Sequence, residues 1–311
     1  MKRALILGIT GQDGSYLAEL LLEKKYVVYG LIRRKSRMNY GNIFCILDRI
    51  HIIDGDITDM VSLLKAIEIS QPNEIYNLAA QSFITRCWQQ PITTSYVNGL
   101  GVTNLLEAIR ITNKNIKYYQ ASTSELYGMV SEVPQTEKTS FRPRNPYAIA
   151  KLHAHWMTVN YREKYNMMTY CGILFNHESE RRGKEFVTRK TTDAIAKIKY
   201  GLLDYLELGN INAERDWGYA PDYVRAMWLM VQSDKPDDYV VATNTTHTVQ
   251  EFVTLAFSIA DIQLMWKHTK EGVVIAIDSQ TNKILVKCIQ NLYRDAEIGL
   301  LRGNPDKAKK F

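Results

Sequence analysis

Long apolar runs, paired cysteines and blocks of like charge are all scarce in this sequence. No stretch reaches the roughly 20 consecutive apolar residues that a membrane-spanning helix needs, and the first apolar run, Ala4 to Leu7, is followed at once by a glycine-rich segment. The cysteines, with no Cys-x-x-Cys among them, are Cys45, Cys87, Cys171 and Cys288. This spacing is typical of reduced thiols. We therefore expect no signal peptide, no transmembrane helix and a cytoplasmic location.

Charge and histidine usage exclude further classes of function. The 39 Lys and Arg exceed the 33 Asp and Glu, giving a net charge of +6, but the basic residues are scattered among acidic ones. A nucleic-acid partner is therefore not expected, and an anionic small molecule explains the surplus equally well. His153 and His155 lie two residues apart on a predicted helix and face different directions, so we expect no metal site.

The first part of the chain alternates short apolar runs with helical patterns, which is typical of a parallel sheet with βαβ connections. Strands are predicted at Arg3–Leu7, Val27–Ile32, Ile50–Asp54, Glu74–Asn77, Lys117–Ser122 and Thr169–Ile173. Helices are predicted at Ser15–Lys24, Asp59–Ser70, Gly99–Arg110 and Tyr147–Tyr165, the last with Asn145 as N-cap and Pro146 in its first turn. This pattern predicts an α/β protein with a Rossmann-type doubly wound parallel sheet.

After Phe175 the alternation stops. Helical patterns follow at Glu185–Tyr200, Asp222–Gln232 and Val249–Ala260, and then two short β-runs at Val273–Ile277 and Ile284–Lys287. We therefore predict a dinucleotide-binding domain over residues 1–174 and a smaller mixed α/β substrate-binding lobe over 175–311, with a cleft between them.

A glycine-rich turn follows the first predicted strand and precedes the first predicted helix. Its glycines, Gly8, Gly11 and Gly14, would let the backbone approach a pyrophosphate, and Thr10, Gln12 and Asp13 lie between them. Free N–H groups at the start of the helix favour such an anion. The alternative is an ordinary tight turn. The strand before and the helix after favour the dinucleotide, and the spacing is that of short-chain dehydrogenase/reductase proteins.

The end of the second predicted strand indicates which dinucleotide is bound. NAD-dependent folds usually have Asp or Glu there, whereas this chain has Arg33 and Arg34. Two guanidinium groups suit a 2′-phosphate, so NADP is predicted; the alternative is two solvated arginines in a loop. Asp56, followed by Ile57, could accept from the adenine amine, although Asp in a turn is often only a turn former.

Tyr147 and Lys151 lie four residues apart and therefore on one face of a predicted helix. An ammonium about 4 Å from a phenol, at an effective dielectric near 20, is worth about 4 kcal/mol, or about three pKa units. We therefore expect Lys151 to lower the pKa of Tyr147 toward neutrality and make it a base. The alternative is a neighbouring pair on the surface.

Further polar residues are expected at the same edge of the sheet. Ser122-Thr123-Ser124-Glu125 and Leu78-Ala79-Ala80 follow two predicted strands, and the carboxyl ends of parallel strands line the ligand crevice. A hydroxyl and a Tyr-Lys pair suffice for alcohol oxidation, so the carboxylate of Glu125 implies a second proton transfer. The alternative is an exposed loop glutamate.

Cationic residues are spread over the second part of the chain. They are Arg181-Arg182, Arg189-Lys190, Arg215 and Arg294. Two or three such donors would suit the phosphates of a nucleotide-diphosphate substrate, although most surface cations are merely solvated.

Taken together, these segments resemble the GDP-mannose 4,6-dehydratase family of extended short-chain dehydrogenase/reductases, from Ala4 to about Lys310. The resemblance is carried by the glycine-rich turn and by Ile75-Tyr-Asn-Leu-Ala-Ala-Gln-Ser, Ser122-Thr-Ser-Glu-Leu-Tyr-Gly, Pro146-Tyr-Ala-Ile-Ala-Lys, Gly172-Ile-Leu-Phe-Asn-His-Glu-Ser, Phe186-Val-Thr-Arg-Lys and Arg215-Asp-Trp-Gly. Phe175 to Ser179, Phe186 to Lys190 and Arg215 to Gly218 are the most particular to this family.

The resemblance implies roles for individual positions. Catalytic roles fall to Thr123, Glu125, Tyr147 and Lys151. Cofactor contacts fall to His177 and Arg182, in addition to the residues above. Contacts with the GDP-sugar fall to Ser82, Glu125, Asn176, Val187, Lys190, Gly209, Arg215, Arg294 and Glu297.

The chain also departs from the family pattern. The family's Ser-Pro before the arginine pair is Ser179-Glu180 here, Lys35-Ser36-Arg37 replaces a serine-rich stretch, and Phe83 to Gln89 differs from the usual run. Relatives continue past Phe311 into a final helix, so the chain is expected to be shortened at its C-terminus.

The resemblance implies conversion of GDP-D-mannose to GDP-4-dehydro-6-deoxy-D-mannose and water by internal NADP redox, a step toward GDP-fucose or GDP-rhamnose. It also implies a homo-oligomer, a dimer or a tetramer, with the segment Arg33 to Asn42 joining subunits. One alternative is a nucleotide-sugar 4-epimerase, which needs no carbon-5 base and commonly keeps NAD; Glu125 and Arg33-Arg34 argue against it. The other is a non-catalytic NADP-binding regulator, against which the presence of Tyr147, Lys151 and Glu125 argues.

Overall fold

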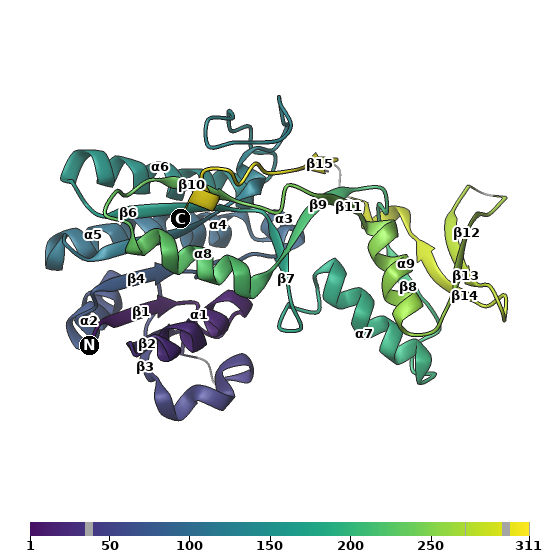
Figure 1. The fold of residues 1–311 in the computed structure, drawn as a ribbon, viewed down its shortest axis with the longest axis horizontal. Helices are drawn as coiled ribbons and strands as arrows, with labels where there is room; N and C mark the ends of the chain where they lie inside the picture. Colours follow the sequence, from purple (N-terminus) through teal and green to yellow (C-terminus); the bar gives the residue numbers. More distant parts are fainter. Residues whose placement is uncertain (35–39, 271, 294–298, 311) are drawn as a thin grey trace.

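A seven-stranded parallel sheet forms the larger part of the protein (Figure 1). The computed structural model describes residues 1–34, 40–270, 272–293 and 299–310. The strand order is β10-β6-β5-β4-β1-β2-β3, which is doubly wound around β1 and β4. The strands are β1 (Arg3–Leu7), β2 (Val27–Ile32), β3 (His51–Asp54), β4 (Glu74–Asn77), β5 (Lys117–Thr123), β6 (Thr169–Leu174) and β10 (Asp238–Val241). Most are almost wholly buried, as expected for strands covered on both faces.

Helices cover both faces of this sheet. One face packs on α1 (Gln12–Glu23) and α8 (Ala220–Gln232), together with the 3₁₀ segment η1 (Gly41–Arg49). The other packs on α2 (Met60–Ser70), α5 (Gly101–Asn113) and α6 (Pro146–Tyr165). The predicted doubly wound sheet and its first four helices are confirmed, with boundaries shifted by up to three residues.

Local capping explains two of these boundaries. Asp59 accepts hydrogen bonds from the backbone N–H groups of Val61 and Ser62 and so starts α2. Asn145 accepts from Ala148 N, and Pro146 lies in the first turn of α6, as expected. Proline fits there because its missing N–H would have no partner in the helix.

A smaller lobe lies beside the large sheet (Figure 1). Its four-stranded mixed sheet has the order β12-β13-β14-β8 and packs on α7 and α9. The elements are α7 (Val187–Lys199), β8 (Leu206–Leu208), α9 (Val249–Ile259), β12 (Leu264–His268), β13 (Val274–Asp278) and β14 (Ile284–Cys288). The predicted smaller mixed lobe is confirmed, and β8 and β12 are strands that the sequence did not indicate.

A third, small sheet connects the two parts. It consists of β7 (Asn176–Glu178), β9 (Glu214–Tyr219), β11 (Thr246–Thr248) and β15 (Leu300–Leu301). The chain after residue 175 also returns to the large sheet through α8 and β10. It therefore contributes to all three sheets, and the proposed division of the chain at residue 174 stays a prediction.

Short elements complete the described chain. They are α3 (Ile84–Gln89), α4 (Pro91–Ser95), the π-helical turn η2 (Tyr96–Leu100), and the 3₁₀ turns η3 (Ser124–Leu126), η4 (Gln290–Leu292) and η5 (Ala308–Lys310). Among the helices described, none combines the length and apolar character that crossing a bilayer requires.

Candidate active site

The glycine-rich turn joins β1 to α1 with very close backbone packing. Gly8 has a φ of +84°, and a Cβ there would lie 2.8 Å from the Leu78 carbonyl oxygen. A Cβ on Gly14 would lie 2.3 Å from the Gly8 carbonyl oxygen. Gly11 is the N-cap of α1 and offers no side chain to the first N–H groups of that helix. The turn therefore requires glycine, and the open start of α1 fits the pyrophosphate of a dinucleotide.

Arg33 and Arg34 are exposed just beyond the end of β2. They line a cavity of about 580 Å³ together with Asp54, Gly55, Asp56, Asp59 and Ser62. Asp56 Oδ1 accepts from the backbone N and the Oγ1 of Thr58, at 2.9 and 2.8 Å, so this carboxylate stabilises its own turn. Ile57 is buried beside it. The cavity fits the adenosine end of a dinucleotide. Lys35-Ser36-Arg37 lie outside the described residues.

The segment Leu78-Ala79-Ala80 continues from β4 and is held on both sides. Leu78 N donates to Leu7 O at 3.0 Å. Further along, buried Asn98 accepts from Gln81 N at 2.8 Å and donates to Gln81 O at 3.0 Å. Asn98 lies on η2, where nothing in the sequence indicated a role, and Ser82 next to Gln81 is exposed. The loop therefore has a fixed backbone at the carboxyl end of the sheet.

Tyr147 and Lys151 are both buried on α6, but Lys151 does not activate the phenol as expected. Its Nζ donates to Ala121 O at 2.9 Å and lies 6.0 Å from the centroid of the Tyr147 ring. Burial raises the pKa of Tyr147 to about 12, partly offset by a hydrogen bond with the Thr123 side chain. Burial also lowers the pKa of Lys151 to about 8. The expectation that Lys151 lowers the pKa of Tyr147 is wrong for this structure, because desolvation of the phenolate dominates.

Thr123 and Glu125 lie where β5 ends, and the structure brings them to Tyr147. Thr123 Oγ1 accepts from Glu125 N at 3.3 Å. The charge of Glu125 contributes to the raised pKa of Tyr147, after the larger effect of burial. Glu125 Oε2 accepts a hydrogen bond from Asn145 Nδ2 at 3.1 Å. A hydroxyl, a carboxylate and a phenol therefore share one site at the carboxyl end of β5, and only the role of Asn145 there was missed.

His177 faces the start of α1. Its Nε2 lies 2.8 Å from Asp13 Oδ2 and its Nδ1 lies 2.7 Å from Phe175 O. The ring stacks on Tyr223 with centroids 4.5 Å apart. Gln12 Nε2 donates to His177 O at 3.1 Å. His177 therefore holds β7 against the glycine-rich turn, and the turn's Thr10 is held separately through its carbonyl by Asn42 Nδ2 at 3.1 Å.

Arg182 lies at the junction of the two lobes. Its Nε is 3.2 Å from Glu178 Oε2, and its guanidinium lies 3.7 Å from the centroid of the Phe186 ring. Phe186 in turn meets Phe83 edge to face, with centroids 6.0 Å apart. Phe83 belongs to the loop after β4 and Phe186 precedes α7, so this contact joins the dinucleotide side to the smaller lobe.

Glu180, in the segment after β7, has a specific partner on α1. Tyr16 OH donates to Glu180 Oε1 at 2.7 Å. Arg181 lies 4.0 Å from the centroid of the Tyr16 ring, and its Nη2 is 2.8 Å from Glu19 Oε1. Glu180 and Arg181 therefore hold the segment after β7 against α1.

The residues expected to contact a nucleotide-sugar lie on the smaller lobe and the small connecting sheet. Lys190, one turn into α7, donates to Glu207 O at 2.6 Å, and burial lowers its pKa. Arg215 is buried in β9 and donates to Glu214 O at 2.8 Å. Asn176 begins β7 and Val187 begins α7. Gly209 follows β8 and packs closely on another segment, because a Cβ there would lie 2.3 Å from Leu292 O. Arg294 and Glu297 lie outside the described residues.

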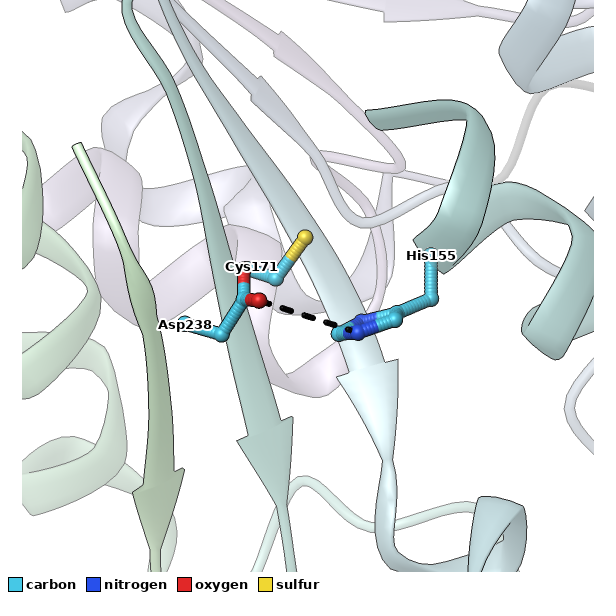
Figure 2. A group of neighbouring side chains, drawn as sticks. All are labelled: His155, Cys171 and Asp238. Carbon is cyan, nitrogen blue, oxygen red and sulfur yellow. Dashed lines mark ion pairs between the residues drawn. The ribbon is translucent and has the colours of Figure 1, made fainter. Parts of the chain in front are cut away.

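Three side chains that could in principle ligate a metal come together between α6 and the large sheet (Figure 2). They are His155 on α6, Cys171 on β6 and Asp238 on β10, with their candidate ligand atoms within 4.8 Å of one another. However, Arg162 Nη2 lies 2.6 Å from Asp238 Oδ1, and this positive charge disfavours a cation. Ser122 Oγ lies 3.0 Å from His155 Nδ1. The cluster therefore braces α6 against the sheet, and the absence of a metal site stays a prediction.

Known proteins are similar to this chain along its whole length. The family model for GDP-mannose 4,6 dehydratase matches residues 5–311. The GDP-mannose 4,6 dehydratase of Drosophila melanogaster is 48% identical over 320 residues, covering 99% of this chain and 80% of the relative. That of Dictyostelium discoideum is 49% identical, covering 100% and 90%, and that of Homo sapiens is 48% identical, covering 99% and 85%.

Solved structures support the fold. The dTDP-glucose 4,6-dehydratase of Bacillus anthracis in complex with NAD superposes with a TM-score of 0.81 at 21% identity, covering 100% of this chain and 90% of the other. The UDP-glucose 4-epimerase of Thermus thermophilus in complex with NAD gives a TM-score of 0.82 at 22% identity, covering 99% and 92%. The chain thus shares its fold with these two proteins, and the full-length matches above show its family: the chain belongs to the GDP-mannose 4,6-dehydratase family.

Proposed function

We propose that the chain converts GDP-D-mannose to GDP-4-dehydro-6-deoxy-D-mannose and water, with NADP as a cofactor that is regenerated in each cycle. The observation that carries the assignment of roles is the meeting of Thr123, Glu125 and Tyr147 at the carboxyl end of β5. A reaction that first oxidises an alcohol and then removes water needs two separate proton acceptors. A phenol and a carboxylate in one site supply both.

Tyr147 takes the proton of the sugar 4-hydroxyl. With its pKa at about 12, the phenol needs added positive charge to accept a proton at neutral pH. Lys151, one turn along the same helix, does not supply it while its ammonium donates to Ala121 O, so in the proposed reaction the ammonium turns from that carbonyl toward the phenol. Since the pKa of Lys151 lies at about 8, this ammonium is mostly charged at neutral pH. Bound NADP would supply the acceptor for the hydride from carbon 4 and return it to carbon 6.

Glu125 takes the second proton, from carbon 5, which the ketone at carbon 4 has made acidic. The bond from carbon 6 to its hydroxyl then breaks, and the hydroxyl leaves as water with the proton that Tyr147 took from the 4-hydroxyl. Thr123 orients the sugar between the two bases. Glu125 finally holds the proton that returns to carbon 5, so each group ends in its starting protonation state.

NADP rather than NAD is proposed because of Arg33 and Arg34. Both are exposed at the cavity beyond β2, where two guanidinium groups match the geometry and charge of a 2′-phosphate. His177 contacts Asp13 of the glycine-rich turn, and Arg182 contacts Phe186 at the junction of the two lobes. Both positions support the proposed cofactor contacts of these residues.

A single incubation tests this function. The protein is mixed with GDP-mannose and NADP, and the nucleotide-sugar is analysed by mass spectrometry for the loss of one water. An unchanged mass, or a change of sugar configuration without loss of water, would point to the regulator or the 4-epimerase instead. Protein with Tyr147→Phe is the control for background dehydration.

A homo-oligomer, a dimer or a tetramer, is proposed in addition. Trp88, Ile92, Tyr96 and Leu100 are exposed at every fourth position across α3, α4 and η2. Ile149 and Trp156 are exposed on α6, against which α4 and η2 pack. Such a concentration of large apolar side chains is typical of an interface. Light scattering that shows a monomer at micromolar concentration would contradict the proposal.

The proposed location is the cytoplasm. All four cysteines are thiols in the structure, and Cys87, Cys171 and Cys288 are buried. Thiols suit a reducing compartment. Cell fractionation with a tagged full chain tests this location.

A further inference from the structure

Asn145 occupies a position from which it can act on both proposed bases. It is almost completely buried and lies directly before α6, the helix that carries Tyr147 and Lys151. Its side-chain oxygen accepts from Ala148 N at 2.8 Å, which fixes the first turn of the helix. Tyr147 lies in that turn, so the contact also fixes the position of the Tyr147 backbone relative to the sheet.

The other end of the same carboxamide reaches Glu125. Asn145 Nδ2 donates to Glu125 Oε2 at 3.1 Å. The orientation of the amide follows from chemistry, because a backbone N–H can bond only to the carboxamide oxygen, which leaves the NH₂ group for the carboxylate. A donor of this kind fixes the direction in which the carboxylate points.

We propose that Asn145 is a positioning residue that holds the Glu125 carboxylate aligned with Tyr147. The inference rests on the proposed function, since Glu125 is the base only if carbon 5 is deprotonated. Asn145 acts through its contact with Glu125. Nothing in the sequence indicated this role, because Asn145 and Glu125 are 20 residues apart and the capping role alone accounts for an asparagine there.

Substitution by aspartate separates positioning from capping. Asp is as good an N-cap as Asn, so Asn145→Asp keeps the start of α6. It removes the NH₂ donor and places a second carboxylate beside Glu125, and two such carboxylates retain a shared proton to higher pH. Asn145→Ser keeps an acceptor for Ala148 N and a hydroxyl donor, so it should resemble the natural protein more closely. Asn115→Asp makes the same change at an exposed site by the amino-terminal end of β5 and is the matched control.

The first measurement needs no cofactor. Protein labelled with ¹³C at glutamate carboxyl carbons is titrated by NMR, and Glu125 is identified by the signal lost in Glu125→Gln. In Asn145→Asp the upper phase of the Glu125 titration should move up by about one pH unit or more. In Asn115→Asp it should not move. Thermal unfolding of all variants is recorded in parallel and should remain close to that of the natural protein.

The second measurement follows exchange of the carbon-5 hydrogen of GDP-mannose with deuterated water in the presence of NADP. At a pH below the upper phase of its Glu125 titration, Asn145→Asp should lower this exchange by up to about tenfold for each unit by which that phase has moved, and the exchange should recover as the pH rises through that phase. Oxidation at carbon 4, which uses Tyr147, should change less.

Two outcomes would overturn the proposal. One is an Asn145→Asp protein whose Glu125 titration and pH profile equal those of the natural protein. The other is an equal loss of exchange in the Asp and Ser variants that follows a lower unfolding temperature, because capping alone would then account for Asn145. Failure of the proposed function gives a different result: the natural protein would not dehydrate GDP-mannose, while the titration would still report on the contact.

Discussion

His177 Nε2 lies 2.8 Å from Oδ2 of Asp13, across the junction between β7 and the glycine-rich turn. The other ring nitrogen, Nδ1, faces the Phe175 carbonyl oxygen. Both partners can only accept hydrogen bonds, so both ring nitrogens carry protons and the ring is an imidazolium. Although burial by itself lowers the pKa of His177, the Asp13 carboxylate leaves it above its ordinary value. Conversely, burial would raise the pKa of Asp13, but His177 leaves it below its ordinary value.

This ion pair predicts a pH-dependent stability. The raised pKa of His177 stabilises the fold below the ordinary pKa of histidine, and the effect is lost as the pH rises through the folded value. The lowered pKa of Asp13 stabilises the fold at pH values above the ordinary pKa of aspartate, and that effect is lost as the pH falls through the folded value. The pair should therefore contribute most between about pH 4 and about pH 6.5.

Asp13→Asn should lower the free energy of unfolding by about 1.5–3 kcal/mol near pH 6, the usual value for a hydrogen bond to a charged group. The difference from the natural protein should shrink at a pH high enough for His177 to be neutral in both proteins. Urea unfolding of the ligand-free protein at both pH values checks this. Asp193→Asn removes a surface carboxylate paired with Lys184 and Lys197 and should show no such trend. A constant difference across this range would mean that the imidazolium assignment is wrong.

The two arginines beyond β2 predict cofactor preference. Replacing Arg33 and Arg34 together with alanine should weaken NADP binding by about 10- to 100-fold, since charge-assisted hydrogen bonds contribute about 1.5–3 kcal/mol and each 1.4 kcal/mol is tenfold. NAD binding should hardly change, because NAD lacks the 2′-phosphate. Calorimetric titration of both dinucleotides measures the ratio, with Lys114→Ala, at the end of α5, as control. Equal affinities in the natural protein would remove the arginines from this role.

Tyr147→Phe tests the first proton transfer. The phenyl ring keeps the buried packing of Tyr147 but has no oxygen to take the proton of the 4-hydroxyl. The variant should bind nucleotide normally and give no reduced-nicotinamide absorbance when mixed with GDP-mannose in a single turnover. Tyr165→Phe at the far end of α6 is the control. Absorbance that persists in Tyr147→Phe would exclude the phenol as the first base.

The fold was largely predictable because strands that are buried on both faces are continuous apolar runs in the sequence. The strands β1 to β6 are short apolar runs separated by amphipathic helices, and each was predicted within a residue or so at either end. β10 was not predicted: its four residues become a strand only by pairing with β6, more than 60 positions earlier. The small connecting sheet was missed for the same reason, since the partners of β7 and β9 are distant in sequence.

The sequence predicted which residues form the site but not how their surroundings change their pKa values. Helical spacing placed Tyr147 and Lys151 on one face, yet it carried no information on burial, which raises the pKa of Tyr147 to about 12. Nor did it indicate that the ammonium turns to the Ala121 carbonyl. Glu125 was found from its place after β5, whereas the bond to Asn145 depends on where α6 begins in space.

Glu125→Gln separates the second proton transfer from the first. Glutamine has the same shape and retains a side-chain oxygen that can accept from Asn145 Nδ2, whose contact with Glu125 is 3.1 Å long. It is not a base at neutral pH, while Tyr147 and Lys151 are untouched. The variant should therefore oxidise carbon 4 and stall, showing reduced-nicotinamide absorbance on mixing with GDP-mannose and little uptake of deuterium at carbon 5. Glu132→Gln, in the loop between β5 and α6, is the control and should turn over. Full dehydration by Glu125→Gln, or normal deuterium uptake, would exclude Glu125 as the carbon-5 base while leaving the family assignment intact, because that assignment rests on the whole chain rather than on one side chain.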